Sequence, residues 1–419
     1  MNEYEEDFTL KDVDLKSKSF LGNLNKKSLI ILSIILSAII VILILILVIY
    51  LSSEKKTEEE QLLPTIGEII CEYEIKDINF NTIILGNDFI KKSNFDIMIN
   101  NKIIKFNKEY KFTERGINTV IFQIKEDLNM DSMFKDVSSL ISVNITSTKK
   151  AKITSLISTF ENCNNLKRFY LEGFDTYDVN SMHKLFYKTF LSKINLTNFI
   201  TKNVVDMSYM FSESLMSEID LSTIDVSSVT NMSHMFDSCS TLKSFMPPLN
   251  SNKLKDISYM FHSCFSLNEL SLDKFDTSNV QDMSHLFQNC EFLESLHINN
   301  LKTSNVIDMS YMFENCGSLT KLDLSNFDTS NTKNMSHMFQ YCNYISELNL
   351  NNFNTSKVED MSFLFFFMRG INSIKINSWD TKSVKNMSNM FQSCFFLKDI
   401  DVSNFNTENV ENISGMFGD

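Results

Sequence analysis

Twelve phenylalanines recur at intervals of 25 or 26 residues, and this period constrains the fold more than any other feature of the 419-residue chain. They are Phe134, Phe160, Phe186, Phe211, Phe236, Phe261, Phe287, Phe313, Phe339, Phe365, Phe391 and Phe417. A fixed period of this length is the signature of stacked supersecondary units, each of which buries its apolar face against its neighbours. The sequence therefore predicts a solenoid over residues 130–419, with an incomplete last repeat.

The repeat around Phe313 shows what each unit is expected to contain. Met309, Met312 and Cys316 share with it one face of a helix, and Asp308 stands where it would cap that helix. The next segment alternates Leu with Lys and Asp, as a strand with one buried face does. The predicted fold class is therefore α/β, a leucine-rich-repeat-like solenoid of helix–strand repeats. Because helices pack further apart than strands, it should curve with a parallel sheet on its concave wall.

An apolar segment precedes the repeats. Residues 29–51 carry no charge, and a helix of this length would measure about 34 Å, enough to cross a bilayer core of roughly 30 Å. Five lysines precede the segment closely, whereas only Lys55 and Lys56 follow it. The positive-inside rule then predicts a transmembrane signal anchor with residues 1–28 in the cytoplasm and the body outside the plasma membrane or in a lumen. A buried core helix is the alternative.

Between the anchor and the repeats we expect a charged linker, residues 52–66, and a small β-rich domain, residues 67–129. Short runs in the latter alternate apolar and polar residues, as half-buried strands do. Asn100-Asn101 and Arg115-Gly116 are turn signals between them. A solenoid needs a terminal element with a polar outer face, and this domain is expected to cover the first coil.

The full repeat pattern resembles a known family. Residues 326–350 follow N-F-[DN]-T-S-N-V-x-[DN]-M-S-x-M-F-x-x-C-x-x-L-x-x-L-x-L with small changes. This pattern is similar to the BspA-like leucine-rich repeat of bacterial and protist surface proteins. The resemblance implies an extracellular solenoid with a role in adhesion or host contact.

Seven cysteines each follow an anchor phenylalanine by three positions: Cys163, Cys239, Cys264, Cys290, Cys316, Cys342 and Cys394. Disulfide staples in an oxidising compartment are one interpretation. However, five of the seven lie in consecutive repeats and cannot all pair, and the expected helix spacing exceeds what a disulfide spans. We therefore favour small buried thiols. No two cysteines share a repeat, so no metal site is expected.

A second column stands two positions before the anchors: Tyr209, His234, Tyr259, His285, Tyr311, His337, Phe363 and Asn389. On the predicted helix it points away from the buried face. We expect a solvated or partly stacked strip on the convex wall, with an aromatic contact strip as the alternative. Its histidines fall in alternate repeats, too far apart to share a metal.

A third column consists of threonines at the predicted turns: Thr176, Thr277, Thr303, Thr329, Thr355, Thr381 and Thr407. Threonine at a turn readily bonds nearby backbone. We interpret the column as pegs that fix each corner, although seven threonines in line could also form a ligand array.

Seven N-x-[ST] sequons are candidate glycan acceptors if the body is luminal or extracellular. Four of them, Asn231, Asn334, Asn386 and Asn412, fall in the helix-cap column and are explained by the repeat itself. Asn144, Asn195 and Asn354 are the better candidates.

Charge and composition exclude several functions. The chain carries 39 Lys and Arg against 52 Asp and Glu, a net charge of −13, which argues against nucleic acid as a partner. The repeats are too alike to build a catalytic cleft, and no triad emerges beyond what the repeat supplies. We expect neither enzymatic activity nor a cofactor.

The concave face is the predicted binding surface for a protein or a glycan, because its polar residues vary from repeat to repeat. Its residues are Arg168, Tyr170, Glu269, His297, Lys321, Asp323, Glu347, Asn349, Lys375, Asp399 and Asp401. The predicted function is recognition or adhesion by a single-pass cell-surface protein. A structural coat element that assembles laterally without a ligand is the alternative, and a hydrolase is the function that the sequence favours least.

Overall fold

The computed structural model describes residues 35, 37–48, 63–149 and 151–418. The chain divides into two compact units, Met1–Pro64 and Thr65–Asp419. In the first unit, residues 35 and 37–48 are helical and exposed. Within the described ranges, no helix has the length and apolar character needed to cross a bilayer. The predicted transmembrane helix is thus not found there, and the predicted head at 1–28, most of the linker and both ends of the apolar segment lie outside the described residues.

The second unit begins with an antiparallel sheet. Its strands, β4 (Lys102–Ile104), β3 (Phe95–Ile99), β6 (Gly116–Ile124) and β1 (Gly67–Ile75), lie side by side in that order. Alternating residues of β1 are buried, which fits the apolar–polar alternation of the sequence. Asn100 and Asn101 form the two-residue turn between β3 and β4, with φ of 51° and 61°. Both values suit a type I′ hairpin, which favours Asn.

This sheet continues directly into the solenoid. β1 pairs antiparallel with β8 (Leu140–Ser147), and β8 pairs parallel with β10 (Arg168–Glu172). Two short ladders accompany the transition, between β2 (Thr82–Ile83) and β5 (Glu109–Tyr110) and between β7 (Leu128–Asn129) and β9 (Ile153–Ser155). The antiparallel strands therefore cover the edge of the first coil, so we call them the cap sheet.

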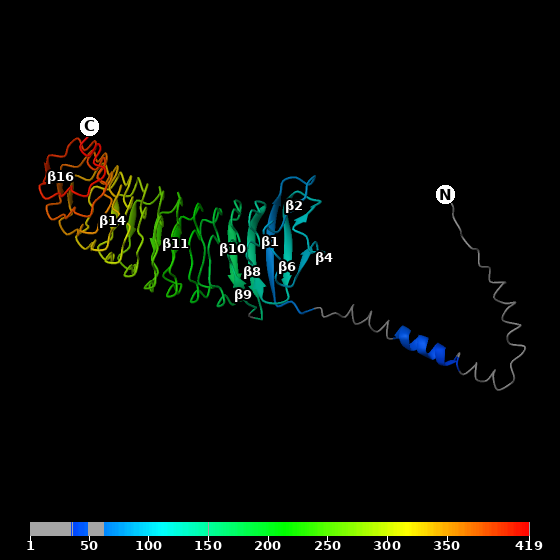
Figure 1. Ribbon diagram of the computed structural model, residues 1–419. Helices are drawn as coiled ribbons and strands as arrows, with labels where there is room; N and C mark the ends of the chain where they lie inside the picture. Colours follow the sequence, from blue (N-terminus) through cyan, green and yellow to red (C-terminus); the bar gives the residue numbers. More distant parts are fainter. Residues whose placement is uncertain (1–34, 36, 49–62, 150, 419) are drawn as a thin grey trace, which may run out of the picture. The chain divides into compact units, whose positions relative to one another are not determined.

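The coils stack in sequence order along the second unit (Figure 1). On one side they pair through short parallel strands. β11 (Glu218–Asp220) pairs with β12 (Ser244–Met246), and β13 (Glu269–Ser271) pairs with β14 (Ser295–His297). Further along, β16 (Ser373–Lys375) pairs with both β15 (Glu347–Asn349) and β17 (Asp399–Ile400). On another side, single-residue parallel bridges run from Lys152↔Asp175 to Asn386↔Asn412. Neighbouring coils are thus hydrogen-bonded on both sides.

The Met and Phe segments are turns and not helices, so the predicted helix–strand repeat is wrong. The N–H groups of Met309, Tyr311 and Phe313 donate to carbonyl oxygens of the next coil at 3.0 Å. The N–H groups of Met312 and Glu314 donate to carbonyl oxygens three residues back, as in β-turns. Tyr311 and Asn315 have φ of 60° and 55°, and such left-handed residues cannot continue an α-helix. The fold is a β-solenoid of about 10 turns and not an α/β repeat.

The strand side also differs from the prediction in two coils, because residues 191–196 and residues 321–324 form no strand. Residues 321–324, expected to form a strand, are not in a ladder, and they separate the β13–β14 sheet from the β15–β17 sheet. The reason for expecting a curved stack also disappears. Neither side of the coils is helical, so there is no wide helical side for the strands to curve against.

The anchor phenylalanines form one continuous stack in the core. Consecutive rings from Phe134 to Phe417 lie nearly parallel, with centroids 5.3 to 6.0 Å apart. At the cap end, Phe122 of β6 contacts Phe134 edge to face at 5.6 Å. The aromatic core therefore runs without a break from the cap sheet through every coil.

The threonine column fixes the corners as predicted. The Thr303 hydroxyl donates to the carbonyl oxygen of Asp328 at 3.0 Å and accepts the Asp328 N–H at 2.8 Å, so it bonds the next coil in both directions. Thr277 and Thr381 make the same pair of bonds one coil onward. Each of these hydroxyls is fully used within the fold.

The cysteine column consists of free thiols, as favoured from the sequence. Each of the seven thiols donates to the carbonyl oxygen of the anchor phenylalanine in the preceding coil, at 3.0 to 3.3 Å. Burial raises the pKa of Cys239, Cys290 and Cys342 to about 12. These thiols are therefore protonated and act as small hydrogen-bonding spacers.

Candidate functional site

The predicted binding residues occupy exposed alternate positions on the strand side of the coils, which we call the strand face. Of the eleven, ten have described side chains, and all of these are exposed: Arg168, Tyr170, Glu269, His297, Lys321, Asp323, Glu347, Asn349, Lys375 and Asp401. Asp399 lies in β17, but its side chain is outside the described part of the structure. The buried residues between them alternate with this exposed set.

The strand register brings some of these side chains together. His297 Nε2 lies 3.6 Å from Glu269 Oε1 on the neighbouring strand, and Asn349 stands opposite Lys375. Arg168, by contrast, pairs with Glu72 of the cap sheet at 2.7 Å, so part of its charge is used within the fold. The strand face is thus an extended surface with local pairs, and its residues do not converge on one pocket.

The column two positions before the anchors forms a stack of aromatic rings, which agrees with the partly stacked strip expected from the sequence. Tyr209, His234, Tyr259, His285, Tyr311, His337 and Phe363 lie nearly parallel with centroids 4.0 to 4.6 Å apart. All are half-buried. We call this set the Tyr/His stack.

A row of polar side chains runs beside the Tyr/His stack. The Asp237 carboxylate accepts hydrogen bonds from Nδ1 of His234 at 2.9 Å and of His262 at 2.6 Å. Burial alone would raise the pKa of Asp237, but these bonds outweigh it and hold that pKa well below its usual range. Three coils onward from Asp237, burial raises the pKa of Glu314, which accepts a bond from Gln340 at 2.7 Å.

This row contains a Ser-His-Asp arrangement whose surroundings do not support catalysis. His262 Nε2 lies 3.2 Å from Ser263 Oγ, and its Nδ1 faces Asp237. A serine nucleophile also needs free N–H groups to stabilise an oxyanion. The N–H groups of His262, Ser263 and Cys264 all donate to backbone carbonyls instead. In the part of the chain that the structure describes, no cluster of His, Cys, Asp and Glu has a metal-binding arrangement either.

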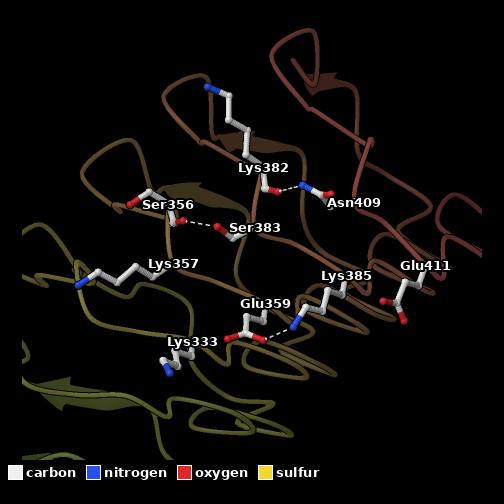
Figure 2. Close-up of a pocket in the computed structure, with 9 residues that line it drawn as sticks. All are labelled: Lys333, Ser356, Lys357, Glu359, Lys382, Ser383, Lys385, Asn409 and Glu411. Carbon is white, nitrogen blue, oxygen red and sulfur yellow. Dashed lines mark hydrogen bonds and ion pairs between the residues drawn. The ribbon is translucent and has the colours of Figure 1, made fainter.

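An open groove of about 530 Å³ crosses the last coils (Figure 2). It is lined by Lys333, Ser356, Lys357, Glu359, Lys382, Ser383, Lys385, Asn409 and Glu411. Lys385 Nζ lies 2.6 Å from Glu359 Oε2, and this contact lowers the pKa of Glu359 and raises that of Lys385. Four lysines against two glutamates leave the groove positive on an acidic chain, so it can attract anionic groups.

Sequence reasoning missed this groove. Its central column alternates in charge every 26 residues: Lys333, Glu359, Lys385 and Glu411. That alternation could have indicated the central column of the groove. The other two lysines, Lys357 and Lys382, come from different positions of the repeat. Their convergence depends on how the corners of successive coils align, which a one-dimensional pattern does not give.

The three preferred sequons differ in exposure. Asn195 and Asn354 are exposed, whereas Asn144 is half-buried in β8 between two paired strands. Asn231, Asn334, Asn386 and Asn412 lie in the ladder of single-residue bridges. Glycosylation stays a prediction, and exposure favours Asn195 and Asn354 as acceptors.

The repeats match a known family. The family described as Mycoplasma protein of unknown function, DUF285, matches residues 128–247, 154–274, 255–347 and 342–419. Together these ranges span more than half of the chain, so the protein belongs to this family. No curated protein matches the chain. Neither the BspA-like subtype nor the signal anchor is established by these matches.

Similar solved structures are leucine-rich repeat proteins. One is a leucine-rich repeat protein from Eubacterium ventriosum ATCC 27560, with 15% identity, a TM-score of 0.35, and 66% of this chain and 90% of that chain covered. Another is the functional domain of InlJ from Listeria monocytogenes, which includes a cysteine ladder. Its identity is 10%, its TM-score is 0.21, and 66% of this chain and 63% of that chain are covered.

Proposed function

We propose that this protein is a non-enzymatic recognition solenoid that binds a protein or glycan through its strand face. The observation that carries the proposal is the contrast between positions. The buried positions of each coil repeat Met, Phe, Cys and Leu, whereas the exposed positions of the strand face differ in charge and size from coil to coil. Stability of the solenoid alone does not require the exposed residues to vary from coil to coil.

The strand face also has the composition of a recognition surface. Lys321, Glu347 and Lys375 alternate in charge along three successive coils, and all three are exposed. A macromolecular partner with complementary charges would be held in one register along the stack. The occupied N–H groups around Ser263 support a role without catalysis.

Charge reversal on the strand face tests this function. The full-length variant carrying Lys321→Glu, Glu347→Lys and Lys375→Glu should lose at least about tenfold in binding to host cells, because complementary pairs become repulsive. Flow cytometry with labelled protein measures this loss. The matched control is Lys333→Glu with Glu359→Lys, a balanced reversal in the groove. If the strand-face variant binds as well as the unmodified chain, the assignment fails.

We further propose that the solenoid is displayed outside the cell. The support is the repeat pattern of residues 326–350, which is similar to that of bacterial and protist surface proteins. An antibody raised against the second unit should label intact cells of the source organism. Labelling that appears only after permeabilisation would place the solenoid inside.

A further inference from the structure

One exposed corner of the solenoid carries an aromatic side chain in every second coil. It is the fifth position after each anchor phenylalanine, which holds Ser266, Phe292, Ser318, Tyr344, Gly370 and Phe396 in successive coils. The three aromatic side chains are 55%, 68% and 57% exposed. Among the described residues, none of these three rings contacts another ring. We call Phe292, Tyr344 and Phe396 the aromatic ridge.

The coil fold does not require aromatic residues at this position. Earlier coils place Leu191 and Met216 there, both fully buried, and Thr241. The position therefore accepts an apolar residue that packs inward or a small polar one. The rings of Phe292 and Tyr344 leave more than half of their surface outside the fold, and large exposed apolar groups of this kind mark interaction surfaces.

The small residues keep gaps open between the rings. The Ser318 N–H donates to the Glu291 carbonyl oxygen at 3.1 Å, which shows that the corners of successive coils touch. A side chain at Gly370 would bring its Cβ within 2.4 Å of the Asn343 carbonyl oxygen, so this gap cannot be filled by a larger residue. At about 4.8 Å per coil, the rings stand roughly 10 Å apart.

At the preceding position, polar residues flank the ridge in three of these coils, whereas Phe265, Gly317 and Phe395 stand there in the other three. Glu291 and Arg369 are exposed, and the Arg369 guanidinium lies 4.2 Å from the centre of the Phe367 ring. Between them, Asn343 Oδ1 is the one buried side-chain oxygen or nitrogen without a hydrogen-bond partner in the described ranges. A buried acceptor of this kind calls for an ordered water.

We propose that the aromatic ridge binds an extended, uncharged β-linked polysaccharide. One face of a pyranose ring consists of C–H groups and can stack on an aromatic ring, while its hydroxyls can donate to the exposed Glu291 carboxylate. In an extended β-1,4-linked chain, alternate sugars turn the same way, so contact recurs at every second sugar. The ridge likewise repeats at every second coil. A folded protein partner has no regular repeat that would match the even spacing of the three rings.

The inference names a ligand class for the proposed recognition function and rests on that function. It uses a corner that is separate from the charged residues of the strand face. The two assignments therefore predict different effects of mutation, and each can fail without the other.

Titration calorimetry of the full-length chain with cellohexaose, chitohexaose, xylohexaose and mannohexaose tests the ridge. At least one hexamer should bind, and more tightly than its dimer, because a dimer reaches only one ring. Phe292→Ser and Tyr344→Ser introduce the residue that neighbouring coils have at this position. Each should weaken binding by about tenfold, as expected for losing one buried aromatic contact. The double variant should show no measurable binding.

Phe265→Ser is the matched control, because Phe265 is 42% exposed and lies one position off the ridge. Its binding should be unchanged, and circular dichroism should show all variants folded. The assignment of the ridge as a polysaccharide site would be overturned if no hexamer bound. It would also be overturned if the double variant bound as tightly as the unmodified chain. If host-cell binding still depends on Lys321, Glu347 and Lys375 in that case, the proposed function stands without it.

Discussion

Tyrosine and histidine occupy backbone conformations in this chain that usually belong to glycine. The six members of the Tyr/His stack from Tyr209 to His337 have φ between 55° and 60°. For a residue with a side chain, this region costs roughly 1–2 kcal/mol. Each inner ring, however, stacks on two neighbours, and an aromatic pair contributes about 0.5–1.5 kcal/mol beyond the area it buries. Stacking between coils therefore offsets the local backbone cost.

The histidines of the stack make stability depend on pH. Burial lowers the pKa of His285 and His337, so the unfolded chain binds protons at a higher pH than the folded chain. Their contribution is complete above the ordinary histidine pKa of about 6.5 and is lost as the pH falls below it. The free energy of unfolding should therefore decrease between pH 7 and pH 5.

The double variant His285→Tyr with His337→Tyr tests this dependence, because tyrosine occupies the same position in alternate coils. It should keep the ring stack and lose less stability than the unmodified chain over that pH range in urea titrations. Asp237, whose pKa is lowered, loses its contribution only below pH about 4 and does not interfere. An identical decrease in both proteins would show that these histidines are not the cause.

At the scale of the coil, hydrogen bonds from the threonine column join neighbouring coils, in place of the helix packing that the sequence led us to expect. Thr303 bonds both backbone groups of Asp328 in the next coil. Thr303→Val should lower the free energy of unfolding by about 1–3 kcal/mol, because it leaves two buried polar groups without partners. Chemical denaturation measures the difference. Thr303→Ser should retain most of the stability, and Thr407→Val, at an exposed site, should have almost no effect.

The buried residues of each coil could be predicted from the sequence, but the backbone between them could not. Met309, Met312, Phe313 and Cys316 were assigned to one apolar face, and all are fully buried. The left-handed residues Tyr311 and Asn315 are four positions apart, so the turns repeat almost as often as a 3.6-residue helix. Tyrosine does not signal a positive φ, and a single asparagine inside a Met- and Phe-rich segment does so only weakly. Asp308 accepts the Ser310 N–H at 2.8 Å, as a cap would, but in a turn.

The candidate site was predictable to a similar extent. Exposure of the strand-face residues followed from alternation with buried leucines, as at Glu347 and Asn349 around Leu348. Contacts between coils were not predictable, because they depend on register. The pairing of Arg168 with Glu72, 96 residues earlier, requires knowing that the cap sheet joins β8.

For the second unit as a whole, the cap sheet is what closes the first coil. β8 pairs with β1 from Tyr73↔Leu140 to Gly67↔Ser147, and removal of the cap would expose this edge together with the Phe134 ring. An open strand edge above an apolar core pairs readily with other chains. A truncated chain that starts at residue 128 should therefore self-associate in size-exclusion chromatography at concentrations where the full chain does not. A folded, monomeric truncation product would show that the first coil needs no cover.

Several columns alternate with a period of two coils and not one. Tyrosine alternates with histidine in the stack, lysine with glutamate in the groove, and a ring with a small residue at the ridge. Gain or loss of a single coil during evolution would set lysine beside lysine and crowd two exposed rings together. Duplication of a pair of coils would preserve every one of these neighbours. Over these coils, a change in length by a pair of coils keeps every neighbour, so we expect relatives of different length to differ there by even numbers of coils.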